Sequence, residues 1–314
     1  MLLWALFICT VLLFLAIDLG IFHKKAAIIS NQEAAKWTLI WVLVSLCFSG
    51  VIYALYHTNF VENPEKLSPS NALLKYITGY VVELSLSADN IFVIAIIFSA
   101  FKIEQKHQHR VLFWGILGAI VFRGILIFFG TLLVQEFNWI TYVFGGFLVF
   151  TALKMGFKKE EDSFDPKNGS VYKLIGRILP VSPIDDQTRF FVKENLKTFV
   201  TPLFIALLII EVMDVVFALD SVPAILSITA DPFLVFSSNI FAILGLRSMY
   251  FFLANLLAKF NYLEYSIIVI LFFIGVKMLL QSFIPLPEWI SLAVIVVSLA
   301  TGIAASLKNI KKNR

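Results

Sequence analysis

The chain has 314 residues, of which 60% are hydrophobic and only 15% are charged, and its mean hydropathy is +0.89. Soluble domains contain about 45–50% apolar and about 25% charged residues, so this composition excludes an ordinary soluble domain. The net charge of +4 is small and its basic residues fall between apolar runs, which argues against a nucleic-acid partner.

The apolar residues lie in runs of about 20, the length that crosses a hydrocarbon core of about 30 Å. We therefore predict an all-α polytopic membrane protein whose surroundings are the lipid bilayer. Nine transmembrane helices are expected in chain order: 2–22, 37–57, 72–100, 111–134, 138–157, 199–227, 234–258, 262–283 and 288–307. The first has no positive segment before it and no small-residue cleavage site, so we expect a retained helix.

Basic residues alternate between the connections. They occur after the first, third and fifth expected helices and in the C-terminal tail, whereas "NFVENPEKLSPSN", "QEFN", "TADP" and "IPLPE" are acidic or nearly uncharged. By the positive-inside rule this pattern places the N-terminus outside and the C-terminus in the cytosol, and an odd number of spans satisfies every loop.

The long cytosolic loop divides the expected helices. Its segment "KKEEDSFDPKNGS" is typical of a solvated, mobile chain, and "VYKLIGRILPV" is amphipathic enough to lie at the cytosolic surface. The chain therefore divides into five parts: two N-terminal helices (1–57), a first three-helix unit (72–157), the loop (158–198), a second three-helix unit (199–283), and the last helix with its basic tail (284–314).

The two three-helix units resemble each other. "FNWITYVFGGFLVFTALKM" (137–155) aligns without gaps on "FNYLEYSIIVILFFIGVKM" (260–278), and "ELSLSADN" (83–90) aligns on "DVVFALDS" (214–221). Because three is odd, the second copy enters the membrane from the opposite side. Such 3+3 inverted repeats are a signature of transporters, whose site lies near the midplane where the copies meet.

Five carboxylates lie well inside the expected spans: Glu83, Asp89, Glu211, Asp214 and Asp220. One unpaired charge at the bilayer centre costs about 2.5–3.5 kcal/mol on insertion scales, so these groups must be paired, protonated or bound to a cation. The basic residues that could pair with them are fewer: Arg123, Lys154, Arg247 and Lys277. Since both acidic clusters share one pattern, a symmetric cation site explains them better than private ion pairs.

Helix geometry orders the polar residues of the first copy. At about 100° per residue, Glu83, Ser87 and Asn90 share one face, and Asp89 lies about 120° from Glu83. In the second copy, three polar residues lie near one face: Glu211, Asp214 and Ser221.

Asp220 lies off the polar face of the second copy. We therefore expect the helices to unwind locally if Asp89 and Asp220 are to join the same ion. Pro223 supplies a reason in the second copy, because it lacks the N–H that would bond to the carbonyl of Leu219. The first copy has no proline there.

All the candidate ligand atoms are oxygens. No histidine lies within a span, and Cys9 and Cys47 lie outside the repeats, too few for a disulfide framework. Oxygen sites suit magnesium, calcium or manganese better than zinc or copper. Arg123 and Arg247, at matched positions, are expected to balance the acids when no metal is bound. Asp18 is expected to cap the first helix or pair with a lysine, or else to touch the ion pathway.

The stretch "EVMDVVFALDSVPAILSIT", with "DPFLVFSSNIFAILGLRSMYFFL", "FIGVKM" and "ELSLSADNIFV", resembles the TerC family. The similarity covers the third to eighth expected helices and includes "DLGIFHKK" and the connector "LPV…FF…TPLF". It implies a protein of the bacterial inner membrane that exports Mn²⁺. It also implies that these residues are metal ligands: Glu83, Asp89 and Asn90 from the first motif, and Glu211, Asp214, Asp220 and Ser221 from the second.

Export of a divalent cation from a negative cytoplasm costs about 4.6 kcal/mol per 100 mV, since each charge costs about 2.3 kcal/mol. We therefore expect alternating access with protons in exchange, because metal and proton compete for the same carboxylates. A calcium or magnesium exchanger and a membrane-protein assembly factor remain alternatives. An enzyme is not expected, because the spans contain no nucleophile–base pair and no HExxH, and no cofactor is expected. The oligomeric state is left open.

Overall fold

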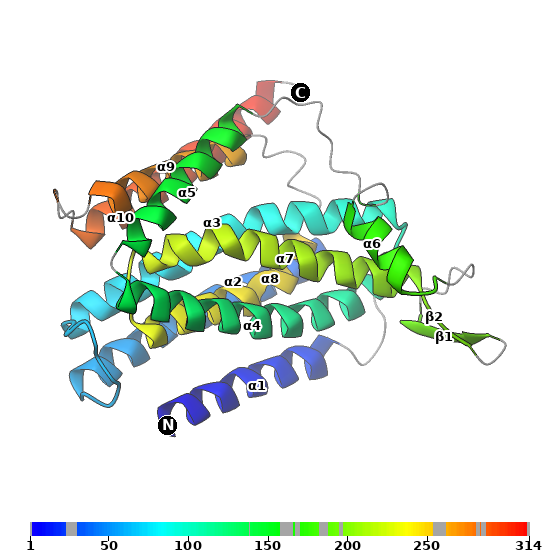
Figure 1. The fold of residues 1–314 in the computed structure, drawn as a ribbon, viewed down its shortest axis with the longest axis horizontal. Helices are drawn as coiled ribbons and strands as arrows, with labels where there is room; N and C mark the ends of the chain where they lie inside the picture. Colours follow the sequence, from blue (N-terminus) through cyan, green and yellow to red (C-terminus); the bar gives the residue numbers. More distant parts are fainter. Residues whose placement is uncertain are drawn as a thin grey trace.

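The structure is a computed structural model. It describes the backbone of residues 2–22, 30–137, 139–157, 166, 170–181, 188–194, 197–253, 262–280, 283 and 287–312. Within these residues the elements are α1 (Leu2–Phe22), α2 (Asn31–His57), α3 (Pro69–Ala100), α4 (Gln105–Glu136), α5 (Ile140–Gly156), α6 (Ser170–Ile178), β1 (Phe191–Glu194), β2 (Lys197–Val200), α7 (Pro202–Leu226), α8 (Pro232–Leu253), α9 (Leu263–Leu280) and α10 (Glu288–Lys312) (Figure 1).

The prediction of an all-α polytopic membrane protein is confirmed, apart from one short hairpin. Of the described helices, five are long and apolar enough to cross a membrane: α2, α4, α7, α8 and α10. Three shorter apolar helices accompany them: Leu2–Ile17, Ile140–Gly156 and Tyr265–Leu280. Each expected span corresponds to one helix, although α2 and α4 begin six residues before the predicted starts of 37 and 111.

Polar caps explain where several helices begin. The hydroxyls of Ser30, Ser68 and Thr201 accept hydrogen bonds from the backbone N–H three residues further on, at 3.3, 3.3 and 3.4 Å. Asp231 caps α8 in the same way, accepting from the N–H groups of Phe233 and Leu234 at 3.0 and 3.3 Å. Each cap satisfies a donor that the first helical turn leaves without a partner.

The predicted unwinding near Asp220 is wrong, because α7 is continuous through Pro223. The proline lies three residues before the helix ends at Leu226, and the backbone around it remains helical. Proline removes one backbone hydrogen bond from the helix. In a membrane protein, neighbouring helices can satisfy the backbone group that is left without a partner. The backbone of α3 is also helical from Pro69 to Ala100, without a break near Asp89.

The helices of the two copies pack in matched pairs. α3 packs on α8 as α4 packs on α7, while α5 packs on α9; α3 also contacts α7, and α4 contacts α8. Figure 1 shows α5, α9 and α10 as a layer on one side of α3 and α7, with α1 on the opposite side. Three clusters of buried apolar side chains fill the spaces between these helices.

Two glycines allow α5 and α9 to approach closely. A Cβ atom on Gly275 would lie 2.8 Å from the carbonyl oxygen of Gly145 and 2.8 Å from Cγ2 of Val149. A Cβ atom on Gly145 would lie 2.9 Å from Cβ of Met278. Small residues at such crossings let backbones pack by van der Waals contact, the main attraction available between helices in lipid.

Part of the loop that we predict to be cytosolic is folded, and its β-hairpin was not anticipated from the sequence. "VYKLIGRILPV" forms most of α6, which packs against α7, and β1 pairs with β2 in an antiparallel hairpin. The guanidinium of Arg110, on α4, lies 4.7 Å from the ring centroid of Phe190 beside this hairpin. The predicted mobile segment "KKEEDSFDPKNGS" lies largely outside the described residues.

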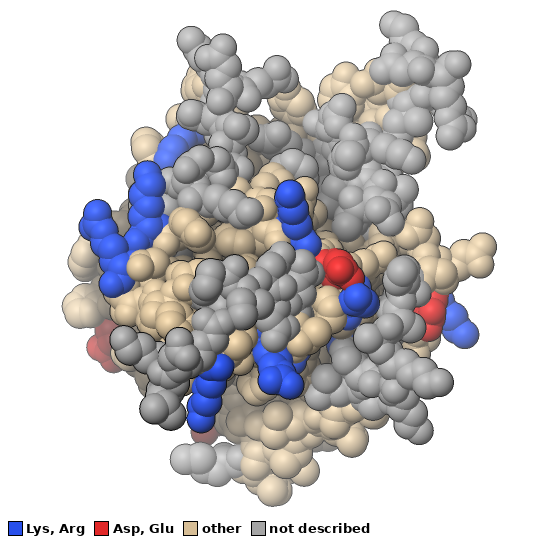
Figure 2. Space-filling model, turned by 90° about the vertical axis from the view of Figure 1, so that its right-hand side faces the viewer, with Lys and Arg blue, Asp and Glu red and all other residues tan. Residues whose placement is uncertain are grey.

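The end of the molecule that carries α6 and the hairpin is basic. Figure 2 shows many more Lys and Arg side chains than acidic ones on this face. Lys102, Lys106 and Arg110, in and just after the α3–α4 connection, are exposed, and Arg110 reaches Phe190 beside the hairpin.

At the other end, a carboxylate joins two loops. Glu65, between α2 and α3, forms an ion pair of 3.0 Å with Lys75 and accepts a hydrogen bond of 3.0 Å from the Thr229 hydroxyl. The Lys75 ammonium also donates to the carbonyl of Ile228 at 2.7 Å. These contacts hold the α2–α3 loop against the turn between α7 and α8.

The glycine crossing gives a stability prediction. Gly275→Ala should lower the thermal unfolding midpoint of the detergent-purified protein, because the added methyl group meets backbone atoms that cannot move away. Overpacking of this kind costs about 1–3 kcal/mol. Gly146→Ala on α5 is the matched control, since its Cβ would meet nothing within 4 Å. An unchanged midpoint for Gly275→Ala would contradict the close crossing.

Candidate metal-ion site

A cavity lies where α3 and α7 meet the α5–α9 layer. It offers ≈ 60 Å³ to water-sized molecules. Its lining comes from five helices: Glu83, Leu86 and Asn90 of α3, Arg123 of α4, Met155 of α5, Phe217, Asp220 and Ser221 of α7, and Ile267 and Leu271 of α9. We call it the central cavity. Both copies of the repeat therefore contribute polar side chains to one enclosed space.

Three buried oxygen atoms of the central cavity have no hydrogen-bond partner among the described residues. They are Oε2 of Glu83, Oδ1 of Asn90 and Oγ of Ser221. The three residues are at most 5% exposed. A buried polar atom left without a partner costs about 1–3 kcal/mol, so three in one place are unusual. The arrangement suits a bound cation or ordered water that completes their coordination.

The guanidinium of Arg123 joins the two copies. It forms an ion pair with Glu83, and it meets Asp214 through two hydrogen bonds, Nη2–Oδ1 at 2.9 Å and Nε–Oδ2 at 3.2 Å. Nη1 also donates to Oδ1 of Asn239 at 3.3 Å. Arg123 is 1% exposed, as is Glu83, so this is a buried charge network that spans α3, α4, α7 and α8.

Asp220 reaches the central cavity from an unbroken helix. Its Oδ1 accepts a hydrogen bond of 3.2 Å from the hydroxyl of Thr151 on α5. The expectation that Asp220 could join Glu83, Asn90 and Ser221 only through unwinding is therefore wrong. The cavity lies between helices, so adjacent residues of α7 can both border it.

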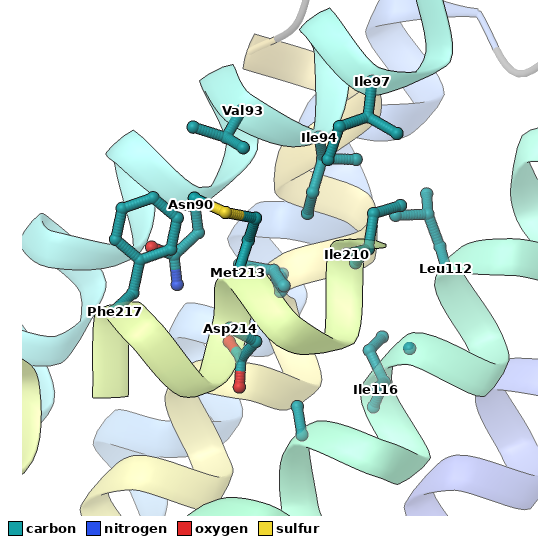
Figure 3. A pocket seen from close by; sticks show the side chains of 13 residues that line it. Asn90, Val93, Ile94, Ile97, Leu112, Ile116, Ile210, Met213, Asp214 and Phe217 are labelled. Atoms are coloured by element: carbon teal, nitrogen blue, oxygen red, sulfur yellow. The ribbon is translucent and has the colours of Figure 1, made fainter. Parts of the chain in front are cut away.

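A second, smaller cavity shares two lining residues with the first and reaches Ile97 and Leu112, near the α3–α4 connection; Figure 3 shows the side chains around it. It offers ≈ 20 Å³, and we call it the inner cavity. Asn90 and Phe217 line both cavities, whereas Asp214 and Met213 line the inner one. The other lining residues have no polar side chain. They come from α3, α4, α7 and α8: Val93, Ile94, Ile97, Leu112, Gly115, Ile116, Ala119, Ile210 and Leu246.

Glu211 lines neither cavity as described. Its carboxylate lies against Gly118 of α4, where a Cβ atom would overlap it, and its Oε2 is buried without a hydrogen-bond partner. The absence of a side chain at Gly118 thus makes room for a carboxylate between α4 and α7. Glu211 remains one turn from Asp214 on the same helix.

Of the other predicted residues, Lys154 is exposed, Arg247 is 1% exposed, and Lys277 donates a hydrogen bond of 2.9 Å to Ser291 of α10. The side chains of Asp18 and Asp89 lie outside the described parts, so the predictions for these two residues stay predictions.

Among the side chains that the structure describes, no group of three or more His, Cys, Asp or Glu residues is arranged to hold a metal ion. The two cavities bring Glu83, Asn90, Asp214, Asp220 and Ser221 near one another, and Arg123 holds two of these acids. A cation site here would therefore combine carboxylates with amide and hydroxyl oxygens.

Several contributors were missed by the sequence reading. Asn239 carried a signal, since it is a polar residue within the apolar run "VFSSNIFAIL". Thr151 and Gly118 carried none, because their roles depend on which helix faces them. Met155 was noted only as a matched position in the repeat.

The chain is similar to known proteins of one family. Residues 68–314 match the family model described as the integral membrane protein TerC family. The chain is 45% identical over 305 residues to the Myxococcus xanthus protein named "Uncharacterized membrane protein STKORF319", covering 97% of this chain and 92% of that one. It is 42% identical over 295 residues to the Escherichia coli K12 protein named "Putative membrane-bound redox modulator Alx", covering 94% and 90%.

A relative from Rickettsia bellii is 42% identical over 310 residues, covering 99% of this chain and 98% of that one. No solved structure matches the chain. The family match covers most of the chain, including both acidic motifs, and the relatives align over nearly their whole length. The chain therefore belongs to the TerC family of integral membrane proteins.

Proposed function

We propose that this protein exports divalent metal ions, Mn²⁺ in particular, by alternating access between two inverted three-helix repeats. The observation that carries the proposal is the central cavity, which Asp220 lines together with Glu83, Asn90 and Ser221, three residues that each have a buried oxygen without a hydrogen-bond partner among the described residues. Carboxylate, amide and hydroxyl oxygens are the ligands that Mg²⁺, Ca²⁺ and Mn²⁺ prefer.

The packing supports the inverted repeat. If α3, α4 and α5 correspond to α7, α8 and α9, the α3–α8 contact becomes the α7–α4 contact, and both are present. The α5–α9, α3–α7 and α4–α8 contacts each map onto themselves. Such a pattern is expected of two copies related by a pseudo-two-fold axis, with the site where they meet. We retain the predicted division of the chain, with repeats at 72–157 and 199–283.

The basic end face supports the proposed orientation. Cytosolic loops of membrane proteins are enriched in Lys and Arg, so α6 and the hairpin would lie in the cytosol of a bacterial inner membrane. The described helices α1–α5 and α7–α10 would then be the nine spans, with the N-terminus outside. The inner cavity, on this side of the central cavity, would be the cytosolic approach to the site.

The described charges suit a divalent substrate. Glu83, Asp214 and Asp220, when ionised, together with Arg123, leave two negative charges around the two cavities. A bound Mn²⁺ would neutralise them, and so would two protons. Because metal and proton compete for the same oxygens, proton entry from outside would favour release of the metal outward. This exchange would supply the energy for export against the membrane potential.

Flux in vesicles tests the proposal directly. Purified protein in liposomes should move Mn²⁺, and an opposing proton gradient should accelerate the movement. Ca²⁺ or Mg²⁺ movement in place of Mn²⁺ would instead favour the alternative exchanger. If no metal moves under any gradient while partner proteins bind, the assembly-factor alternative is favoured and the transport proposal is lost.

Neutralising one cavity carboxylate should abolish transport. In Asp220→Asn, the site loses a negative charge and gains an amide donor, so Mn²⁺ efflux from cells should fall to the background rate with protein abundance near normal. Glu104→Gln is the control, because Glu104 is an exposed residue beyond the spans. Export at the parental rate by Asp220→Asn would overturn the assignment. We expect the same loss for Asp89→Asn.

Removing Arg123, the arginine that pairs with both acids, should destabilise the folded protein, so that any loss of transport follows from loss of folding. Arg123→Leu leaves Glu83 and Asp214 as buried carboxylates without their counter-ion, which costs about 3–5 kcal/mol. The yield of monodisperse protein should therefore drop. Adding Glu83→Gln and Asp214→Asn should restore folding but not metal flux. Lys36→Leu, at an exposed position of α2, is the control for loss of a basic residue within a helix. Normal folding of Arg123→Leu alone would show that the ion pairs contribute little.

A further inference from the structure

We propose that two methionine thioethers, those of Met155 and Met213, make this pathway selective for transition-metal ions over Ca²⁺ and Mg²⁺. The inference rests on the proposed export function and deepens it by naming the substrate class. Oxygen ligands alone accept Mg²⁺, Ca²⁺ and Mn²⁺, so they do not separate these ions. A thioether is a soft ligand, and soft ligands favour transition-metal ions over the hard alkaline-earth cations Mg²⁺ and Ca²⁺.

The two methionines lie in the cavities where the protein would distinguish one metal ion from another. The chain has five methionines, and one lines each cavity: Met155 in the central cavity and Met213 in the inner cavity. Figure 3 shows the thioether end of Met213 directed toward Asn90, the residue that borders both cavities. A cation moving from the cytosolic side would meet one sulfur beside Asp214 and the other beside Asp220.

The remaining lining shows why sulfur matters here. Apart from the polar residues already described, the central cavity is bordered by Leu86, Phe217, Ile267 and Leu271, which offer no ligand atoms in their side chains. Met155 is the only lining residue of α5 or α9 among those described that carries a side-chain donor atom. Among the described lining residues, the α5–α9 layer could therefore offer an ion only the sulfur of Met155 as a side-chain donor, while α3 and α7 could offer oxygen.

Methionine also fills irregular spaces in cores, so a packing role must be separated from a ligand role. The repeat supplies the comparison. Met278 of α9 aligns with Met155, yet it is 1% exposed within an apolar cluster and contacts Gly145. It does not line either cavity as described. Met278 is thus a methionine with the packing role alone.

The test measures selectivity in liposomes with Met155→Leu, Met213→Leu and the control Met278→Leu. Leucine has nearly the same volume and lacks sulfur, so the fold should tolerate it. The concentration of Ca²⁺ that halves Mn²⁺ flux should fall about tenfold in Met155→Leu, a change of the size that loss of a supporting group causes at metal sites. Met213→Leu should shift in the same direction, and Met278→Leu should match the parent.

Two further measurements keep the result decisive. Met155→Cys should retain the preference for Mn²⁺ over Ca²⁺, because it restores a sulfur ligand. If Met155→Leu carries no flux, equilibrium binding of Mn²⁺ and Ca²⁺ to the detergent-purified variant decides, with the same loss of preference expected. Unaltered selectivity in both leucine variants would overturn the role of sulfur and leave the export function intact. If the parent protein moves no metal, the proposed function itself fails.

Discussion

The buried guanidinium of Arg123 is the constraint on which the site depends. It receives a carboxylate from each copy, Glu83 from α3 and Asp214 from α7, and the amide oxygen of Asn239 from α8. Two carboxylates at this depth without a counter-ion would be too costly to keep ionised. With it, both acids stay in place, and Oε2 of Glu83 remains available to the cavity. The Arg123 guanidinium thus stabilises two buried acids, and under the proposed function a mobile cation would balance the negative charge that remains.

The sequence predicted the helices well because lipid imposes a strict rule on backbone hydrogen bonds and length. It also matched Glu83 with Asp214, and the structure brings these two residues to one arginine. The sequence-based prediction failed for Asp220. It considered only the angles at which side chains leave a single helix axis. A cavity between two helices accepts side chains over a wide arc, so Asp220 and Ser221 can both reach it. The hairpin was missed because its strands are only four residues long.

The layering of the helices bears on how access could alternate. The α5–α9 pair is joined closely through Gly145 and Gly275, and the central cavity lies between this pair and the helices that carry the acids. The hydroxyl of Thr151 on α5 donates a hydrogen bond of 3.2 Å to Asp220, and the described α5 and α9 residues that line the cavity are Met155, Ile267 and Leu271. Movement of α5 and α9 together would therefore break this hydrogen bond, whereas the Ile267 and Leu271 surfaces could slide without breaking directional bonds.

The two copies are not equivalent, and α10 is the physical reason. It packs along α9 and α3, and its Ser291 accepts a hydrogen bond from Lys277, whereas the matched Lys154 on α5 is exposed. The same difference separates Met278, buried in an apolar cluster, from Met155, which borders the central cavity. An inverted repeat by itself would offer an ion two equivalent surroundings. Because α10 packs on the part of α9 that carries Lys277, whereas Met155 of α5 borders the central cavity, a site between the proposed repeats would be asymmetric.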